Sequence, residues 1–499
     1  MPRLEMSKYE SEEKYRIYIS RLIEQKYVGG FCIFGGTLES VPIILDELQG
    51  LAKKTSLPPL LMSCDCEWGL PMRLHSGGTE FPHFMALERM NDQKGIRQVA
   101  KAIGDEMSVL GLHWNFAPVA DVNSNPNNPI INIRAFSGDP EIVAECATSF
   151  YEGLEDASII ATAKHFPGHG DTHIDSHSDL PIIDKSFEEF DSLELVPFKR
   201  IMQGGIPSIM TGHIAAPKLA EKFGAKGYAE NLPTTISSYL TQKLLREYLS
   251  FEGIIITDSL EMHGLRKIMS HPGEIASHAF AAGADILLMP TDPIAAYKGL
   301  KDGIDRGAIL LENVDKSIIR IEKLRDKYLT QRLPKIAVQW VDHQQIAYNA
   351  AKRSINLEGN IPKPLLPSSV LIIASNSERE KRQKEITTMF FGSRYPGLSV
   401  RFADEGFNEE LGKNPLIIIM HRPRGMLTGE INTESVSVKA KTTIQKLKGT
   451  NTTPTGIVCF GDPYIADNFR ITNPDFILCT YSDSIPSVIM ALELLNENI

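Results

Sequence analysis

Several features that would place this chain in other protein classes are scarce or missing. Its 499 residues contain no run of 18 or more apolar residues, and no basic segment leads into an apolar one near the start. The sequence therefore predicts neither a transmembrane helix nor an export signal. Its 52 Lys and Arg residues are outnumbered by 62 Asp and Glu without any long basic run, which argues against nucleic acid as a partner.

Cysteine is also sparse. The six cysteines form neither a CxxC pair nor a zinc-finger spacing, which is typical of reduced thiols in a cytoplasmic protein. With 42% hydrophobic and 23% charged residues, the composition is that of a globular chain long enough for two or three domains. The net charge of -10 favours small or neutral partners.

Short β-rich runs alternate with amphipathic stretches along the first two thirds of the chain. Eight such runs occur: MPRL, GGFCIF, LLMSCD, HWNFAPVAD, IIATAKH, SIMTGH, GIIITD and ADILLM. This alternation is typical of parallel βα units. Eight units in about 300 residues predict a closed (β/α)₈ TIM barrel rather than an open sheet.

A second domain is predicted after a helical segment over residues 313–328. We place the boundary near residue 335, which gives a barrel domain over 1–335 and a smaller one over 336–499. The apolar runs SSVLIIAS, PLIIIM, GIVCF and DFILCT and a closing helix predict an open α/β sandwich there. No Gly-rich phosphate loop follows these strands, so we predict no cofactor and interpret this domain as structural.

Charged residues and histidines close five of the predicted barrel strands: Asp65, Asp121, Lys164 with His165, His213, and Asp258. Active sites of such barrels lie at the carboxyl ends of the strands, so most of these side chains are expected to meet in one site. For two of these residues, a purely structural role stays open. Asp121 can be a structural polar residue bonded to a neighbouring loop, and Asp258 can cap the next helix.

Residues 164–181, KHFPGHGDTHIDSHSDLP, crowd four histidines and three aspartates together. On a helix their spacing of four would form a metal-binding stripe, but Pro167, Gly168 and Gly170 break a helix there, so no metal site is predicted. In a loop, Asp175 and His177 can form an acid/base pair, because a carboxylate on one imidazole nitrogen leaves the other to exchange a proton. The alternative is a solvated loop with local aspartate turns.

Taken together, these motifs carry a family resemblance. KHFPGHG with DSH, GIIITDSLEM at 253–262, DCEWGLPMRL at 65–74, NFAPVADV at 115–122 and INIRAFSGDP at 131–140 resemble glycoside hydrolase family 3. The match is to its β-N-acetylglucosaminidase branch and covers most of the first 330 residues. One departure is Trp68 in DCEWG, where family members often have glycine; we favour packing over sugar stacking for this ring.

The resemblance implies a retaining mechanism through a covalent glycosyl-enzyme. It assigns Asp258 as nucleophile and the pair Asp175 and His177 as acid/base. The residues that it implies for sugar binding are Asp65, Arg73, Arg134, Lys164, His165 and, at the border of the site, His213. Each could alternatively form a structural salt bridge, with Arg134 and Asp65 the first candidates for such a pair.

The expected activity is removal of a terminal β-linked N-acetylglucosamine from a carbohydrate substrate. Because His177 would be neutral after giving up its proton, and Lys164 and Arg73 are expected to make the site net positive, inorganic phosphate as well as water can be the acceptor. A β-glucosidase, a β-glycoside phosphorylase and an inactive sugar-binding module are the alternatives. No cofactor, metal, nucleic acid or membrane is expected, and the predicted location is cytoplasmic.

Overall fold

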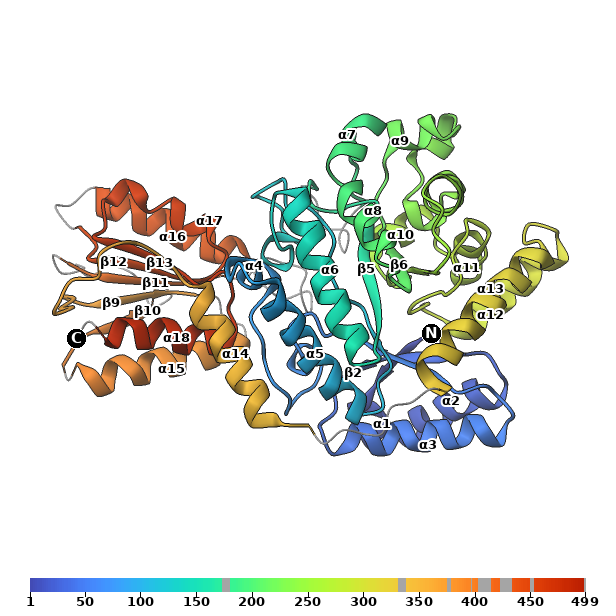
Figure 1. The fold of residues 1–499 in the computed structure, drawn as a ribbon, viewed down its shortest axis with the longest axis horizontal. Helices are drawn as coiled ribbons and strands as arrows, with labels where there is room; N and C mark the ends of the chain where they lie inside the picture. Colours follow the sequence, from blue (N-terminus) through green and yellow to red (C-terminus); the bar gives the residue numbers. More distant parts are fainter. Residues whose placement is uncertain are drawn as a thin grey trace. The chain divides into compact units, whose positions relative to one another are not determined.

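The computed structural model describes residues 1–172, 180–330, 338–374, 378–395, 397–402, 414–421, 433–448 and 453–497 (Figure 1). It divides into two compact units. The first unit comprises Met1–Thr79, Gln93–Asn128 and Ala135–His343, and the second comprises Glu80–Asp92, Pro129–Arg134 and Gln344–Ile499. Two short segments of the N-terminal part thus pack with the C-terminal part, which the sequence did not predict.

In the described part of the first unit, seven parallel strands pair in chain order. They are β1 (Arg3–Glu5), β2 (Gly30–Phe34), β3 (Leu61–Cys64), β4 (Trp114–Asn115), β5 (Ile160–Phe166), β6 (Ser208–Thr211) and β7 (Ile254–Thr257). Parallel neighbours need a crossover connection after each strand, and helices supply most of these connections. Because all the strands run the same way, their carboxyl ends lie along one edge of the sheet.

The α-helices described in this unit are α1 (Met6–Ser11), α2 (Glu13–Glu24), α3 (Ser40–Lys54), α5 (Gln93–Val109), α6 (Pro140–Asp156), α7 (Phe187–Ser192), α8 (Leu195–Gln203), α9 (Pro217–Lys222), α10 (His263–Ile268), α11 (Pro272–Ala281), α12 (Pro293–Asp305) and α13 (Leu311–Arg325). Two of them begin with the same Asp-Pro pair. Asp139 caps α6 by accepting from the backbone of Glu141 and Ile142, and Asp292 caps α12 in the same way. Proline suits the first helical position because its missing N–H would lack a helical partner there.

The eighth predicted strand, ADILLM, forms no regular strand. Seven of the eight strands expected for the barrel are therefore present in the described residues. The residues of ADILLM still bond to both ends of the sheet: Ile286 bridges Ile256 of β7, and the Met289 N–H donates to Met1 O at 2.8 Å. The sheet curls around a core drawn from β2 to β7 and this segment: Cys32, Leu61, Trp114, Phe116, Ile160, Met210, Ile254, Ile256, Ile286, Leu288 and Met289. The fold shown is a curled parallel sheet.

The second unit is built on a six-stranded mixed sheet in the order β10-β9-β11-β12-β13-β8 across its described residues. The strands are β8 (Asn356–Gly359), β9 (Val370–Ile373), β10 (Val400–Phe402), β11 (Leu416–His421), β12 (Gly456–Gly461) and β13 (Phe476–Cys479). Only β8 runs antiparallel to its neighbour in this sheet. The helices are α4 (Phe84–Arg89), α14 (Trp340–Ser354, which begins in the first unit), α15 (Glu378–Arg394), α16 (Thr433–Lys448), α17 (Tyr464–Asp467) and α18 (Ile485–Asn496).

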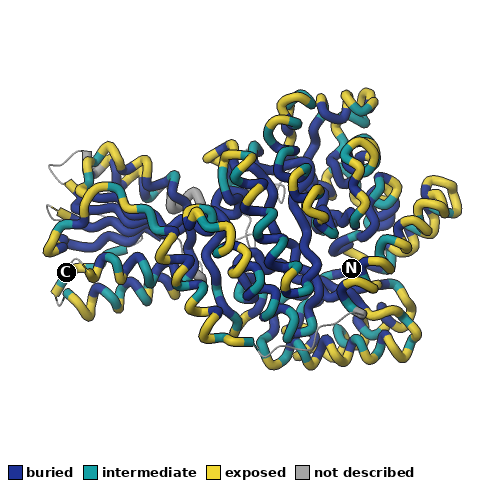
Figure 2. Tube along the Cα trace, viewed as in Figure 1, coloured by how far each residue is buried: buried dark blue, intermediate teal, exposed yellow. Residues whose placement is uncertain are grey.

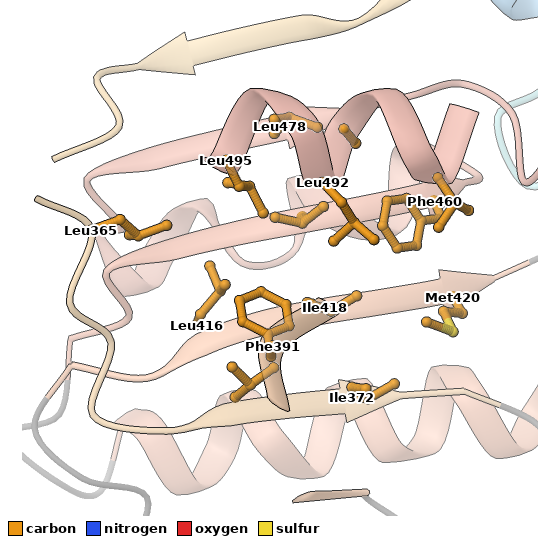
Figure 3. Packing of buried hydrophobic residues seen from close by; sticks show 14 of the residues in the cluster. Leu365, Ile372, Phe391, Leu416, Ile418, Met420, Phe460, Leu478, Leu492 and Leu495 are labelled. Carbon is orange, nitrogen blue, oxygen red and sulfur yellow. The ribbon is translucent and has the colours of Figure 1, made fainter. Parts of the chain in front are cut away.

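Helices cover both faces of this second sheet, with α15 and α18 on one side and α16 on the other (Figure 1). On the first side, Phe391 and Leu492 pack against Ile372, Ile418 and other strand residues (Figure 3). Figure 2 shows both sheets as buried. Burial on both faces explains why these strands are continuous apolar runs and not alternating patterns. The predicted α/β character of the C-terminal part is confirmed.

The predicted domain boundary near residue 335 falls in 331–337, outside the described residues. Across the part of the chain that the structure describes, no helix is long and apolar enough to cross a membrane.

Candidate functional site

The predicted site residues of the first unit stand at the carboxyl edge of its sheet. Asp65 directly follows β3, His213 lies two residues past β6, and Asp258 directly follows β7. Lys164 and His165 lie near the carboxyl end of β5. Parallel strands bring these positions to the same edge, which is where such folds place their chemistry.

A buried group of four charges forms around Asp65 and Lys164. The Lys164 ammonium lies 3.1 Å from Asp65 Oδ1 and 2.8 Å from Glu67 Oε1, and its side chain is only 2% exposed. Arg73 donates to Asp65 Oδ2 through Nη2 at 2.6 Å and Nε at 3.2 Å. The Arg73 guanidinium also lies over the ring of Phe34, the last residue of β2, which fixes its plane.

These charges cancel within the group. Burial alone would raise the pKa of Asp65, but the charges of Arg73 and Lys164 lower it from 3.8 to about 2, so the carboxylate stays ionised. Two cations are therefore matched by two carboxylates, Asp65 and Glu67. Lys164 and Arg73 therefore give these four residues no excess positive charge, because Glu67 supplies a second negative charge that the sequence reasoning did not count.

A second buried network joins Asp121 to the KHFPGHG segment. Asp121 Oδ2 lies 2.7 Å from His165 Nδ1, while Oδ1 accepts from the backbone N–H of His165 at 3.1 Å and of His169 at 2.7 Å. Burial would raise the pKa of Asp121, yet the charge and hydrogen bonds of His165 hold it below its usual value. The carboxylate fixes the orientation of the His165 ring and leaves Nε2 as the nitrogen that can meet a ligand.

The strand itself is irregular where Lys164 and His165 stand. The pairing of β5 with β6 shifts register between Ala163 and Phe166. In a regular strand, consecutive side chains point to opposite faces, whereas a bulge re-aims one of them. This irregularity accounts for two neighbouring residues of one strand both reaching buried carboxylates at the edge of the sheet.

The KHFPGHG glycines are required by close packing. A Cβ on Gly170 would lie 1.6 Å from Val122 O, so the segment can lie against the 122–123 backbone only with glycine there. Gly168 has φ +133°, in the region that favours glycine. The segment is also held by Asn128, whose amide donates to His169 O at 2.8 Å and to Gly170 O at 2.9 Å.

Asp258 is only half-buried and sits beside residues that hold its backbone. Its N–H donates to Thr211 O at 3.0 Å, and its Oδ1 accepts from the Ser259 N–H at 2.7 Å. The next helix, α10, begins five residues later with Met262 as its capping residue, so Asp258 is not the helix cap considered as an alternative.

His213 is completely buried next to this turn. Its Nε2 lies 2.8 Å from Ser259 O and its Nδ1 lies 2.7 Å from Thr235 Oγ1. Because both ring nitrogens have protein partners, the ring holds the backbone that follows Asp258.

Arg134, by contrast, belongs to the second unit. It ends the short helix Asn132–Arg134, packs with the second unit, and donates from Nη1 to Ile130 O at 3.3 Å. Within the first unit, Asp65 pairs with Arg73. Arg73 is eight residues away on the same loop, so the local partner takes the carboxylate.

The predicted acid/base pair, Asp175 and His177, falls in 173–179, outside the described residues. Trp68 is fully buried, as expected of a ring that packs under the loop. Among the described residues, no group of three or more His, Cys, Asp or Glu side chains is placed to hold a metal ion.

Two buried residues of this site were missed by the sequence reasoning. Glu67 stands in the same DCEWG motif as Asp65, and only its pairing with the distant Lys164 reveals its place. His169 is one of the histidines noted for their spacing of four. Burial, with a smaller effect from His165, lowers its pKa to about 4, and the Asp258 carboxylate is close enough to oppose that shift.

The ionised state of Asp65 gives a test of this geometry. Its lowered pKa means that the ion pairs stabilise the fold at pH values above 3.8 and lose this effect as pH falls toward 2. The difference in free energy of unfolding between the wild type and Asp65→Asn should be constant from pH 7 to 5. It should then shrink by about 2 kcal/mol as pH falls to 2, measured by urea denaturation. A difference that does not change with pH would contradict the assignment.

Comparison with known proteins identifies the class. Residues 3–324 match the model of the glycosyl hydrolase family 3 N-terminal domain. The chain therefore belongs to glycosyl hydrolase family 3.

The chain is similar to several proteins of known name. It is 34% identical to beta-hexosaminidase A of Pseudoalteromonas piscicida over 329 residues, which is 62% of this chain and 55% of that protein. It is 30% identical to a beta-hexosaminidase of Hydrogenovibrio crunogenus over 278 residues, which is 54% of this chain and 73% of that one. The chain thus spans only about half the length of the first of these relatives.

Solved structures extend the likeness to both units. A family 3 beta-N-acetylglucosaminidase from Paenibacillus sp. str. FPU-7 superposes with a TM-score of 0.80 at 26% identity, covering 96% of this chain and 93% of that one. A beta-glucoside phosphorylase, BglX, shares the fold with a TM-score of 0.78 at 20% identity, covering 98% and 95%.

Proposed function

We propose that this chain is a retaining β-glycosidase that removes terminal β-linked N-acetylglucosamine. The observation that carries the proposal is the placement of Asp258, a half-buried carboxylate directly after β7, at the sheet edge that holds the charges of Asp65 and Lys164. The names of the beta-hexosaminidase relatives and of the Paenibacillus beta-N-acetylglucosaminidase support the substrate class.

The proposal includes a closed (β/α)₈ barrel over residues 1–335 and a smaller α/β domain over 336–499. The hydrogen bonds of Ile286 toward β7 and of Met289 to Met1 support closure, since this segment then takes the place of the eighth strand. The six cysteines are all buried and unpaired, which supports a reducing, cytoplasmic location.

The reaction assigned to these residues is a double displacement. The Asp258 carboxylate attacks the anomeric carbon while His177, oriented by Asp175, donates a proton to the departing oxygen. A covalent glycosyl-enzyme forms with release of the aglycone. Neutral His177 then takes a proton from water, which attacks the same carbon and releases the sugar with its β configuration retained.

Sugar binding is assigned to the buried charges. Asp65, Arg73, Lys164 and His165 offer ionised donors and acceptors held in fixed positions, and such groups strongly reject a sugar that lacks a matching hydroxyl. Arg134 is also assigned to sugar binding, because it belongs to the INIRAFSGDP segment that resembles the family motif. The contacts of His213 with Ser259 support a role in holding the turn after Asp258.

Water is the acceptor that the charges favour. Because Glu67 and Asp65 cancel Lys164 and Arg73, these four residues provide no excess positive charge to attract phosphate. Two aryl glycosides, a β-N-acetylglucosaminide and a β-glucoside, assayed with and without 10 mM phosphate separate the candidate activities, with products identified by NMR. We expect faster turnover of the N-acetylglucosaminide, with no effect of phosphate. Accumulation of a sugar 1-phosphate would instead identify a phosphorylase. If neither glycoside were turned over, the chain would be an inactive sugar-binding module.

A further inference from the structure

Asp121 is completely buried, and both of its carboxylate oxygens are bound by the KHFPGHG segment. Oδ1 accepts from the backbone N–H groups of His165 and His169, at 3.1 and 2.7 Å. Oδ2 lies 2.7 Å from the ring nitrogen Nδ1 of His165. Because the carboxylate is closed in this way, Asp121 cannot itself contact a sugar, and any effect that it has on the reaction must pass through these partners.

The backbone that carries Asp121 is fixed against β5. The Ala120 N–H donates to Lys164 O at 2.6 Å, and the Lys164 N–H donates to Pro118 O at 3.2 Å. The carboxylate therefore has a fixed position relative to the strand that carries His165. A rigid acceptor of this kind holds an imidazole ring in one orientation.

The place of the proton on the His165 ring follows from the ionisation of Asp121. Burial would raise the pKa of Asp121, but the charge and hydrogen bonds of His165 hold it below its usual value, so the carboxylate is ionised and can only accept. The ring nitrogen that faces it, Nδ1, must therefore carry a proton. In the neutral ring, the free lone pair is then on Nε2, which can accept a hydrogen bond from a hydroxyl group.

We propose that Asp121 is a positioning residue for sugar recognition, which keeps the proton on Nδ1 of His165 and so makes Nε2 the acceptor for one sugar hydroxyl. This inference rests on the proposed function, which assigns His165 to sugar binding. Lys164, the preceding residue of β5, can only donate. The two neighbouring side chains thus offer a hydroxyl group both kinds of hydrogen-bond partner.

Asp121→Asn tests the proposal, because the backbone decides how an asparagine lies at this position. The N–H groups of His165 and His169 require an acceptor in the place of Oδ1, so the amide oxygen takes that place and the NH₂ group faces Nδ1. An NH₂ group can only donate, so the ring must present a lone pair at Nδ1 and carry its proton on Nε2. The variant keeps both backbone hydrogen bonds and turns the sugar's acceptor into a donor.

The kinetic test is a double-mutant cycle on an aryl β-N-acetylglucosaminide. Asp121→Asn should lower kcat/KM about 10- to 100-fold, the range for a buried polar group left without its partner. His165→Ala, which removes the ring, should lower it at least as much. The double variant should be no worse than His165→Ala alone, because a residue that acts only through the ring has no effect once the ring is gone. A merely structural Asp121 would instead multiply the two losses.

NMR of protein labelled with ¹⁵N-histidine reports the ring without any need for turnover. The His165 signals are assigned by their absence from His165→Ala. Nδ1 should be protonated in the wild type and unprotonated in Asp121→Asn. If Asp121→Asn does not fold, the wild-type spectrum alone decides.

Glu106→Gln is the matched control, because Glu106 is also completely buried and holds a histidine in the same way. It lies 2.9 Å from Nδ1 of His343 and accepts from the Thr79 N–H at 2.9 Å. Helix α5, which carries Glu106, provides none of the assigned sugar contacts. Its kcat/KM should stay within about twofold of the wild type, as expected for a network that shares no partner with the site.

The outcomes separate the proposal from the proposed function. Multiplied losses in the double variant, or an unprotonated Nδ1 in the wild type, would overturn the role of Asp121 while leaving His165 as a sugar contact. If His165→Ala keeps full activity, the assigned sugar contact is wrong, and the role of Asp121 falls with it.

Discussion

Replacing Asp258 by alanine is expected to lower kcat/KM for every glycoside by about 10⁴-fold or more, without loss of the fold. The reason is that the first bond to the anomeric carbon comes from this carboxylate, and no other group can replace it. The described fold should survive, because the carboxylate is only half-buried and lies at the edge of the sheet, outside the apolar core. Steady-state rates and the melting temperature measured together check both expectations.

Glu261→Gln provides the control for this variant. It changes another carboxylate three residues along the same loop, which is 38% exposed and contacts Arg3 at 3.3 Å. Its activity should remain within about twofold of the wild type, as is usual for exposed residues away from the chemistry. Retention of more than a few per cent of activity in Asp258→Ala would mean that another group is the nucleophile.

His177→Ala is expected to have the second-largest effect, and that effect should depend on the leaving group. For N,N′-diacetylchitobiose, kcat/KM should fall about 10²- to 10⁴-fold, which is the range that general acid catalysis contributes. For a 2,4-dinitrophenyl glycoside it should change little, because that group leaves as a stable anion. The decrease in kcat/KM at high pH, which reports loss of the imidazolium proton, should also disappear in the variant.

Asp175→Asn should give a smaller loss than His177→Ala, since it keeps the ring but removes the carboxylate that favours the imidazolium. The acid should then titrate at a lower pH, because an opposite charge raises the pKa of a histidine and its removal lowers it. His173→Ala, a histidine in the same stretch outside the DSH motif, is the comparison variant. Equal losses on both substrates for His177→Ala would contradict the assigned role.

The strands of the first unit could be predicted because each is a short apolar run followed by a polar turn. The eighth run, ADILLM, resembles the others in composition, but its hydrogen bonds depend on β7 on one side and Met1 on the other. A local pattern carries no information about such partners. For the same reason, the packing of Pro129–Arg134 with the C-terminal unit was not foreseen.

The site could be predicted where strand geometry alone decides it. Asp65 and Asp258 directly follow parallel strands and Lys164 lies near the carboxyl end of another, and the fold brings such positions to one edge of the sheet. Side-chain pairing could not be predicted in the same way. In the sequence, Glu67 has nothing that distinguishes it from other acidic residues. Its place in the site follows only from the structure, where the Lys164 ammonium, far along the chain, lies 2.8 Å from it.

Covalent trapping is the most direct measurement of the central claim, that Asp258 attacks the sugar. A 5-fluoro N-acetylglucosaminyl fluoride keeps the acetamido group, reacts in the first step because fluoride leaves readily, and slows the second step because the ring fluorine disfavours an oxocarbenium-like transition state. Intact-protein mass spectrometry should show one added sugar, and peptide analysis should place it on Asp258. A label on another residue, or rapid turnover through the sugar's own acetamido group with no labelled protein, would contradict the claim.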